Sequence, residues 1–335
     1  MFHYMGLIAA LGDGSQRLIA GYRLTGADVP FGDPLPSHRT EMEGWFWRVT
    51  EPSTGRAIVA LCSVNRHPEG DWSTTAVALH PGGIVRAAAL DGAVATHPPF
   101  NVAAGSGAST FSAGAEGVDF RLDDVHLRME FSEPFVWPKA FGGGGVFSSI
   151  PFLNQYWHPY RLGGLASGSV EFDEGQRWDF SDATLYAERN WGAGFPQRWW
   201  WGQAHDFGGA DVSVAFSGGL LELGPLNREV TGVVVRLGRK VIRLTPPMPV
   251  RSVIGESYWS IRGRSPRYQI ELEGDGAGLA PHVMPVPLPA ERRNVDNDFE
   301  HLGGRLHLTV KESGRVIFSG TSELAGLEIG SRPPG

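Results

Sequence analysis

Residues Tyr186 to His205 read Y-A-E-R-N-W-G-A-G-F-P-Q-R-W-W-W-G-Q-A-H, and this stretch decides the fold of the chain. If its two ends are strands, Gly192, Gly194 and Pro196 supply the turn between them. Because successive side chains of a strand point to opposite faces, each strand then has one face that mixes aromatic and polar groups. These faces carry Tyr186, Glu188 and Asn190 in the first strand and Trp199, Trp201, Gln203 and His205 in the second.

Such a face is typical of a pocket for a large apolar ligand, in which aromatic rings bury the ligand and a few polar groups orient it or transfer protons. The alternative is that the tryptophans are ordinary core residues. The polar members of the same faces argue against that alternative, because each polar side chain buried without a partner costs about 1–3 kcal/mol. We therefore expect this stretch to line a cavity.

The composition indicates an all-β protein. The 335 residues include 46 glycines and 24 prolines, and short apolar-alternating runs recur between turn signals, which is typical of antiparallel barrels or sandwiches. One such pair runs from Gly44 to Val49 and returns from Ala57 to Val64. The second half predicts a meander of about eight or more strands, enough to close a small barrel whose interior holds one ligand.

The domain boundary is predicted near a glycine-rich segment. Four consecutive glycines lie between residues 134 and 152, flanked by proline-bounded apolar patches, and this is the sharpest change of composition in the chain. We interpret the glycines as a flexible linker or a pocket lid. The sequence therefore predicts an N-terminal β domain over residues 1–140 and a C-terminal lipocalin-like β-barrel domain over residues 141–335.

Charge and cysteine content exclude several classes of function. The net charge of −7 and the absence of a lysine–arginine cluster exclude a nucleic-acid-binding role. The single cysteine, Cys62, excludes an internal disulfide framework and is compatible with a reducing compartment. The N-terminal residues have no basic n-region and only a short apolar stretch. We expect a soluble, cytoplasmic protein.

No motif for a metal or a cofactor is present. The chain has no H-E-x-x-H, no G-x-G-x-x-G after a strand and no G-x-S-x-G elbow. Asp296, Asp298 and Glu300 form an acidic run without the spacing of a calcium loop, and we interpret this run as part of a long, solvated loop from Pro281 to His301. We therefore expect no metal site and no cofactor.

With these motifs absent, the residues favour acid–base chemistry in a dry aromatic pocket. A carboxyl group that is shielded from water has a raised pKa and can deliver a proton near neutrality. Glu188 is the strongest candidate for this acid, and Glu43, which lies next to Trp45 and Trp47 in sequence, is the second. Tryptophan faces can stabilise a positive centre by about 2 kcal/mol or more when desolvated. Such a pocket suits protonation of an isoprenoid double bond.

Four blocks of sequence resemble the tocopherol cyclase family, which is distantly similar to the carotenoid hydratases. The resemblance lies in the motifs M-E-G-W-F-W-R-V (Met42 to Val49), W-H-P-Y-R-L-G-G-L-A-S-G-S-V-E-F (Trp157 to Phe172), F-S-D-A-T-L-Y-A-E-R-N-W-G-A-G-F-P-Q-R-W-W-W-G-Q (Phe180 to Gln203) and L-A-G-L-E-I-G (Leu324 to Gly330). The blocks follow the family's order from about residue 41 to the end, and the third block is highly specific.

This resemblance implies two lipocalin-like, calycin-type antiparallel β-barrels or half-barrels and a cofactor-free reaction. In that reaction a prenylated hydroquinone closes to a chromanol-type ring through alkene protonation and capture of the cation by the phenol. Together with the pocket argument, it predicts catalytic roles for Glu188, Asn190 and Glu43. The predicted substrate-binding residues are Trp45, Trp157, His158, Tyr186, Trp191, Trp199, Trp201, Gln203 and His205.

Two other functions are compatible with the same motifs. The chain could be a non-catalytic carrier of a lipid or quinone, because this fold does not by itself imply catalysis. It could also be an isoprenoid hydratase, in which water rather than a tethered phenol captures the cation. We favour the enzyme, because a carrier does not require the polar groups that accompany the tryptophans. The expected partner is a hydrophobic small molecule, taken up through transient contact with a membrane, and no obligate protein partner is indicated.

Overall fold

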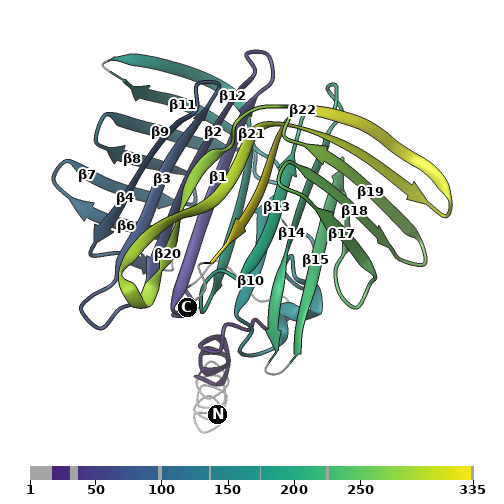
Figure 1. Ribbon diagram of the computed structural model, residues 1–335, viewed down its shortest axis with the longest axis horizontal. Coiled ribbons are helices and arrows are strands. Elements are labelled where there is room, and N and C mark those ends of the chain that lie inside the picture. The colour runs from purple at the N-terminus through teal and green to yellow at the C-terminus, as the bar shows by residue number, and fades with distance from the viewer. Residues whose placement is uncertain are drawn as a thin grey trace, which may run out of the picture.

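The computed structural model describes residues 17–30, 37–96, 100–135, 137–173, 175–223 and 226–332. These residues form two antiparallel β-sheets that lie side by side (Figure 1). Within the described ranges, helical structure is limited to residues 17–23 and two short 3-10 turns, η1 (Gly145–Ser149) and η2 (Pro289–Glu291). The predicted all-β fold with two barrels or half-barrels is confirmed.

The first sheet has the strand order β4-β3-β2-β1-β12-β11-β9-β8-β7-β6-β5, and β10 pairs with β12 outside this path. Strand β4 contacts β6, β7 and β8, so the sheet curls back on itself. Its strands are β1 (Met42–Glu51), β2 (Arg56–Asn65), β3 (Trp72–His80), β4 (Ile84–Asp91), β5 (Val94–Thr96), β6 (Asn101–Ser106), β7 (Ser109–Gly114), β8 (Gly117–Leu122), β9 (Val125–Ser132), β10 (Gln155–Arg161), β11 (Leu165–Phe172) and β12 (Gln176–Gly192).

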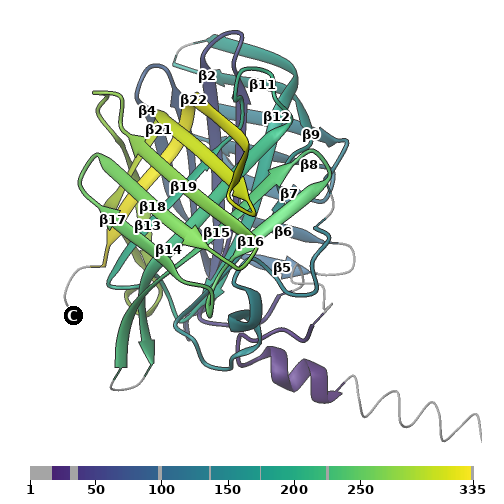
Figure 2. The ribbon, with the colours of Figure 1, turned by 90° about the vertical axis from the view of Figure 1, so that its right-hand side faces the viewer.

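The second sheet has the order β16-β15-β14-β13-β22-β21-β19-β18-β17, and β20 pairs with β21. Its strands cross in front of those of the first sheet in the view of Figure 2, and contact between β15 and β17 curls it as well. Its strands are β13 (Arg198–Ala204), β14 (Val212–Leu223), β15 (Leu226–Leu237), β16 (Lys240–Leu244), β17 (Val250–Ile254), β18 (Tyr258–Arg264), β19 (Tyr268–Asp275), β20 (His282–Leu288), β21 (Arg293–Glu312) and β22 (Arg315–Ser331).

Apolar side chains fill the concave interior of each sheet. Trp47 packs edge-on against Phe120 in the first interior, and Trp200 and Phe216 belong to the core of the second. A ligand inside the second barrel, as the strand count predicted, would have to displace this core. The space that remains lies instead between the two sheets, as described below, because each interior is closed by its own packing.

The chain changes from the first sheet to the second at residues 193–197, between β12 and β13. The predicted boundary at residues 140 and 141 therefore lies inside the span of the first sheet. The glycines near that boundary approach the second sheet closely. Gly145 has φ of +63°, and a Cβ there would lie 2.3 Å from Thr245 Oγ1. Arg243 Nη1 also donates to the carbonyl oxygens of Phe141 and Gly142, at 2.7 and 3.1 Å.

The segment that was interpreted as a long acidic loop is a pair of strands. β20 pairs with β21 alone among the described strands, and it packs against β3 and β4 of the first sheet (Figure 1). Pro285 and Pro287 are compatible with this edge position, because an edge strand does not need every N–H for pairing. Asp298 and Glu300 therefore lie on a strand, and both are buried. The expectation of a solvated loop at these two residues was wrong.

Candidate functional site between the two sheets

A cavity lies between the two sheets. The first sheet lines it mainly with the face that points away from its own core, and the second sheet contributes residues of β13, β14, β20, β21 and β22. The aromatic members of the lining include Phe46, Trp157, Phe195, Trp199 and Trp201. The site thus belongs to neither barrel alone.

Glu188 is the acid that the first sheet presents to this cavity. Its side chain is 5% exposed, and its Oε2 atom accepts hydrogen bonds from Trp157 Nε1 and Trp201 Nε1, both at 2.7 Å, and from the hydroxyl of Tyr186. Among the described residues, no donor reaches Oε1. Burial raises the pKa of Glu188 to about 7, and the three donors oppose this shift only in part.

The aromatic groups around Glu188 come from both sheets. Trp201 packs edge-on against Phe46, with ring centroids 5.1 Å apart, and lies 6.0 Å from the ring of Tyr186. Alternation along β13 places the indole of Trp200 on the other side, where it joins the core of the second sheet. The sequence pattern therefore predicted correctly which tryptophans of this strand share a face.

Asn190 lies on the same face of β12 as Glu188 and also lines the cavity. Its Oδ1 atom has no hydrogen-bond partner among the described residues, and this oxygen occupies the space opposite Gly44, the register partner of Asn190 on β1. A Cβ on Gly44 would lie 2.3 Å from this oxygen. The glycine of the E-G-W motif therefore gives Asn190 its position.

Glu43 and Trp191 occupy the opposite face of the same two strands. Glu43 Oε2 forms a fully buried ion pair with Arg189 Nη2 at 3.1 Å, and its Oε1 accepts from Ser37 Oγ and the backbone N–H of Thr40. Trp191 stacks on Tyr156 and donates to the carbonyl oxygen of Gly26. The structure thus separates both residues from Glu188.

Trp45 lies beside this ion pair. Its ring packs under the guanidinium of Arg189, 5.0 Å from the ring centroid, and its side chain belongs to the core of the first sheet. It still borders the inter-sheet cavity. Of the predicted site residues Glu43, Trp45 and Trp191, which the structure places on this face, Trp45 is therefore the one that reaches both regions.

The two predicted histidines are buried away from water. His158 Nδ1 accepts from the backbone N–H of Gly143 at 3.1 Å, and burial lowers the pKa of His158 to about 3. Burial also lowers the pKa of His205, which lies 6.3 Å from the ring of Tyr186. Both imidazoles are neutral near pH 7, which makes them poor proton donors.

Gln203 joins the two sheets through Arg48. Arg48 Nη1 donates to Gln203 Oε1, and Nη2 donates to the carbonyl oxygens of Leu302 and Leu324, all at 2.9 Å. Burial lowers the pKa of this guanidinium to about 10, so it stays charged near neutrality. Gln203 therefore supports the wall of the cavity by binding Arg48.

Three buried carboxyl groups of the second sheet also face this cavity, and the sequence reasoning missed all of them. Asp298 and Glu300 lie on β21, and Glu328 lies on β22 within the L-A-G-L-E-I-G motif. Trp199 Nε1 donates to Glu328 Oε1. The available signal was the two-residue spacing of Asp298 and Glu300, which places both on one face of a strand.

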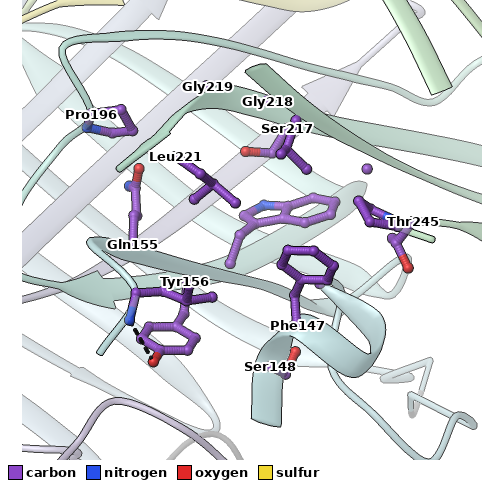
Figure 3. Close-up of a pocket in the computed structure, with 16 residues that line it drawn as sticks. Phe147, Ser148, Gln155, Tyr156, Pro196, Ser217, Gly218, Gly219, Leu221 and Thr245 are labelled. Atoms are coloured by element: carbon purple, nitrogen blue, oxygen red, sulfur yellow. Dashed lines mark hydrogen bonds between the residues drawn. The ribbon is translucent and has the colours of Figure 1, made fainter. Parts of the chain in front are cut away.

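A second chamber adjoins the first and shares Gln155, Trp157 and Ser217 with it. Its wall is largely apolar, and Figure 3 shows Phe147 of η1 and Leu221 of β14 approaching it from opposite sides. Four glycines border this chamber: Gly144, Gly218, Gly219 and Gly232.

In the described ranges, no three histidine, cysteine, aspartate or glutamate side chains are grouped so as to hold a metal ion. Within the same residues, no helix combines the length and the apolar character needed to cross a membrane.

Two solved structures share this fold. The crystal structure of CghA with Sch210972 superposes with a TM-score of 0.63 at 13% identity, covering 92% of this chain and 95% of that one. Kievitone hydratase from Nectria haematococca gives a TM-score of 0.52 at 12% identity, covering 88% and 90%. At these identities the likeness concerns the fold alone.

Sequence comparison identifies the family. The chain is 30% identical to the chloroplastic tocopherol cyclase of Zea mays over 210 residues, which are 58% of this chain and 43% of that protein. It is also 30% identical to a probable chloroplastic tocopherol cyclase of Oryza sativa subsp. japonica over 213 residues, 59% of this chain and 44% of that one. The chain thus spans less than half the length of these curated relatives. The family model for tocopherol cyclase-like proteins matches residues 126–331, more than half of the 335, and the chain therefore belongs to the tocopherol cyclase-like family.

Proposed function

We propose that the protein is an enzyme that cyclises a prenylated hydroquinone, or a related prenylated phenol, by protonating its double bond. The observation that carries this proposal is Glu188, a nearly buried acid that neutral donors surround in the wall of an aromatic cavity. The names of the curated relatives, tocopherol cyclases of two plants, support the same reaction class.

In the proposed reaction, Glu188 transfers its carboxyl proton to one carbon of the alkene, and a tertiary cation forms at the other carbon. The faces of Trp157 and Trp201 stabilise this cation by cation–π attraction. The phenol oxygen then attacks the cation and forms the ring C–O bond. Its proton returns to the Glu188 carboxylate, so the product is an isomer of the substrate and the enzyme is regenerated.

The three donors to Glu188 Oε2 serve both halves of this cycle. They stabilise the carboxylate after proton transfer, because hydrogen bonds to a charged oxygen are stronger than those to a neutral one. They also hold the carboxyl group in place, with Oε1 as the oxygen that carries the proton. The apolar chamber beyond Trp157 has the composition that a prenyl tail requires.

The test is incubation with a panel of prenylated hydroquinones, without added cofactor or metal and in the presence of a strong chelator. We expect a product of unchanged mass and altered retention in chromatography coupled to mass spectrometry. A product heavier by one water would instead identify a hydratase. Tight binding of the ligands without any product would identify a carrier.

A further inference from the structure

The second sheet presents a cluster of three carboxyl groups to the cavity wall that Glu188 shares. Asp298 and Glu300 are two residues apart on β21, and Glu300 is the register partner of Glu328 on β22. The three side chains therefore share one face of the sheet. Burial is the main cause that raises the pKa of both Glu300 and Glu328, and repulsion from Glu188 across the cavity adds to it.

Glu328 accepts a hydrogen bond from Trp199 Nε1. Asp298 and Glu300 are 7% and 1% exposed, and within the described part of the chain Asp298 Oδ1 and Glu300 Oε1 have no hydrogen-bond partner. A buried polar atom left unpaired costs free energy, so an unpaired oxygen in a cavity wall indicates a donor that a ligand supplies.

The nearest cation does not supply that hydrogen bond. Arg48 attracts Glu300 electrostatically, but it donates its hydrogen bonds to Gln203 and to the carbonyl oxygens of Leu302 and Leu324. Burial and repulsion from Glu328 raise the pKa of Asp298 and of Glu300, which favours their uncharged forms. Uncharged carboxyl groups bind hydroxyl groups better than they bind cations.

We infer that Asp298, Glu300 and Glu328 form the binding site for the hydroxyl groups of the ligand's aromatic head, with the unpaired oxygens of Asp298 and Glu300 as the direct acceptors. This inference rests on the proposed function, in which the ligand is a prenylated phenol. The head group then lies against the second sheet with its double bond toward Glu188 on the first. The tail passes Trp157 into the adjoining apolar chamber.

The test measures binding rather than turnover. The probes are a hydroquinone with a saturated alkyl chain, which offers no double bond to protonate, and the corresponding quinone, which has the same skeleton but no hydroxyl hydrogens. We expect the wild-type protein to bind the hydroquinone about tenfold more tightly than the quinone in equilibrium dialysis. Equal affinities for the two probes would overturn the inference without any variant.

Substitutions then test the contribution of Glu300 to this preference. Glu300→Met removes one of the two unpaired acceptors at similar volume and should lower the affinity ratio from about tenfold to about threefold or less, whereas Glu300→Gln keeps a side-chain oxygen and should restore most of the ratio. Glu323→Gln, an exposed site on β22, is the matched control and should leave the ratio unchanged. Thermal unfolding of each variant shows that it is folded.

A wild-type ratio in folded Glu300→Met would overturn the inference. These results are separable from those of the cyclisation assay. A ratio that depends on Glu300 in a protein that forms no cyclised product would contradict the proposed function and leave the head-group site standing. Cyclisation by a protein whose affinity ratio does not depend on Glu300 would support the proposed function and contradict the head-group site.

Discussion

Two acids on the same pair of strands, β1 and β12, have opposite surroundings. Glu43 lies on the face that packs into the first core, is fully buried and forms an ion pair with Arg189. Glu188 lies on the face that lines the inter-sheet cavity, where one hydroxyl and two indole N–H groups bind it. The two carboxyl groups thus differ in their partners, a guanidinium for Glu43 and neutral donors for Glu188. Burial without a cation raises the pKa of Glu188 to about 7, so this acid can hold and deliver a proton near neutrality.

The largest effect on stability is expected for Glu43→Gln. Removing one partner of a buried ion pair is expected to cost about 3–5 kcal/mol of unfolding free energy, because the desolvated charge of Arg189 loses its carboxylate. Urea unfolding measures this loss. The control is Glu171→Gln, which breaks an exposed ion pair with Arg177 and should cost less than about 1 kcal/mol. A Glu43 variant of normal stability with abolished turnover would transfer the acid role to Glu43.

Glu188→Gln should lower turnover by about 10²-fold or more, because the amide retains the size of the side chain but has no acidic proton to transfer. Affinity for the saturated-chain hydroquinone should persist. Single-turnover kinetics and equilibrium dialysis measure the two quantities, with the exposed Glu130→Gln on β9 as the control. If binding and thermal stability fall together with turnover, the role of Glu188 is structural.

The pH dependence of turnover and of stability follows from the titration of Glu188. Since the pKa of Glu188 is raised from 4.5 to about 7, kcat should be highest below pH 7 and fall about tenfold per unit above it. The folded state also holds a proton that the unfolded chain releases above pH 4.5. The stability that this proton contributes is complete below that pH and is lost as the pH rises through about 7. A kcat that stays constant from pH 6 to 9 would contradict proton donation by Glu188.

The smallest effect is expected in the second chamber. Leu221→Phe adds bulk opposite Phe147 (Figure 3), so KM should rise several-fold for substrates with long tails. KM for a substrate with a single prenyl unit should not change, and this substrate is the internal control. An equal rise in KM for both tail lengths would show that the tail does not bind in the second chamber.

The sequence predicted correctly which side chains share a face within one continuous strand. The two-residue period correctly placed Tyr186 and Glu188 on one face of β12, and it placed Trp199 and Trp201 together on β13. It also separated Glu43 from Phe46 on β1, because only local geometry was needed. It could not show that these faces point out of their own barrels and toward each other. That arrangement depends on contacts between distant segments.

The carboxyl groups of the second sheet were missed for a related reason. Pro285 and Pro287 on β20 suggested a loop, and the burial of Asp298 and Glu300 depends on how β21 and β20 pair and pack. Glu328 likewise acquires its role through pairing with Glu300. A strand is recognised locally, but the group that it faces is set by its partners across the sheet.

The hydrogen bonds of the site also imply an order of folding. The bond from Trp201 to Glu188 spans 13 residues, whereas the bonds from Arg48 to Leu302 and Leu324 span 254 and 276. The entropic cost of closing a loop rises with its length. The bond between Glu188 and Trp201 can therefore form early, whereas Arg48 can bind its carbonyl acceptors only after β22 has been added. On a ribosome, Arg48 would stay hydrated until almost the whole chain had emerged. Closure of the two sheets around the cavity is thus expected to be a late event of folding during synthesis.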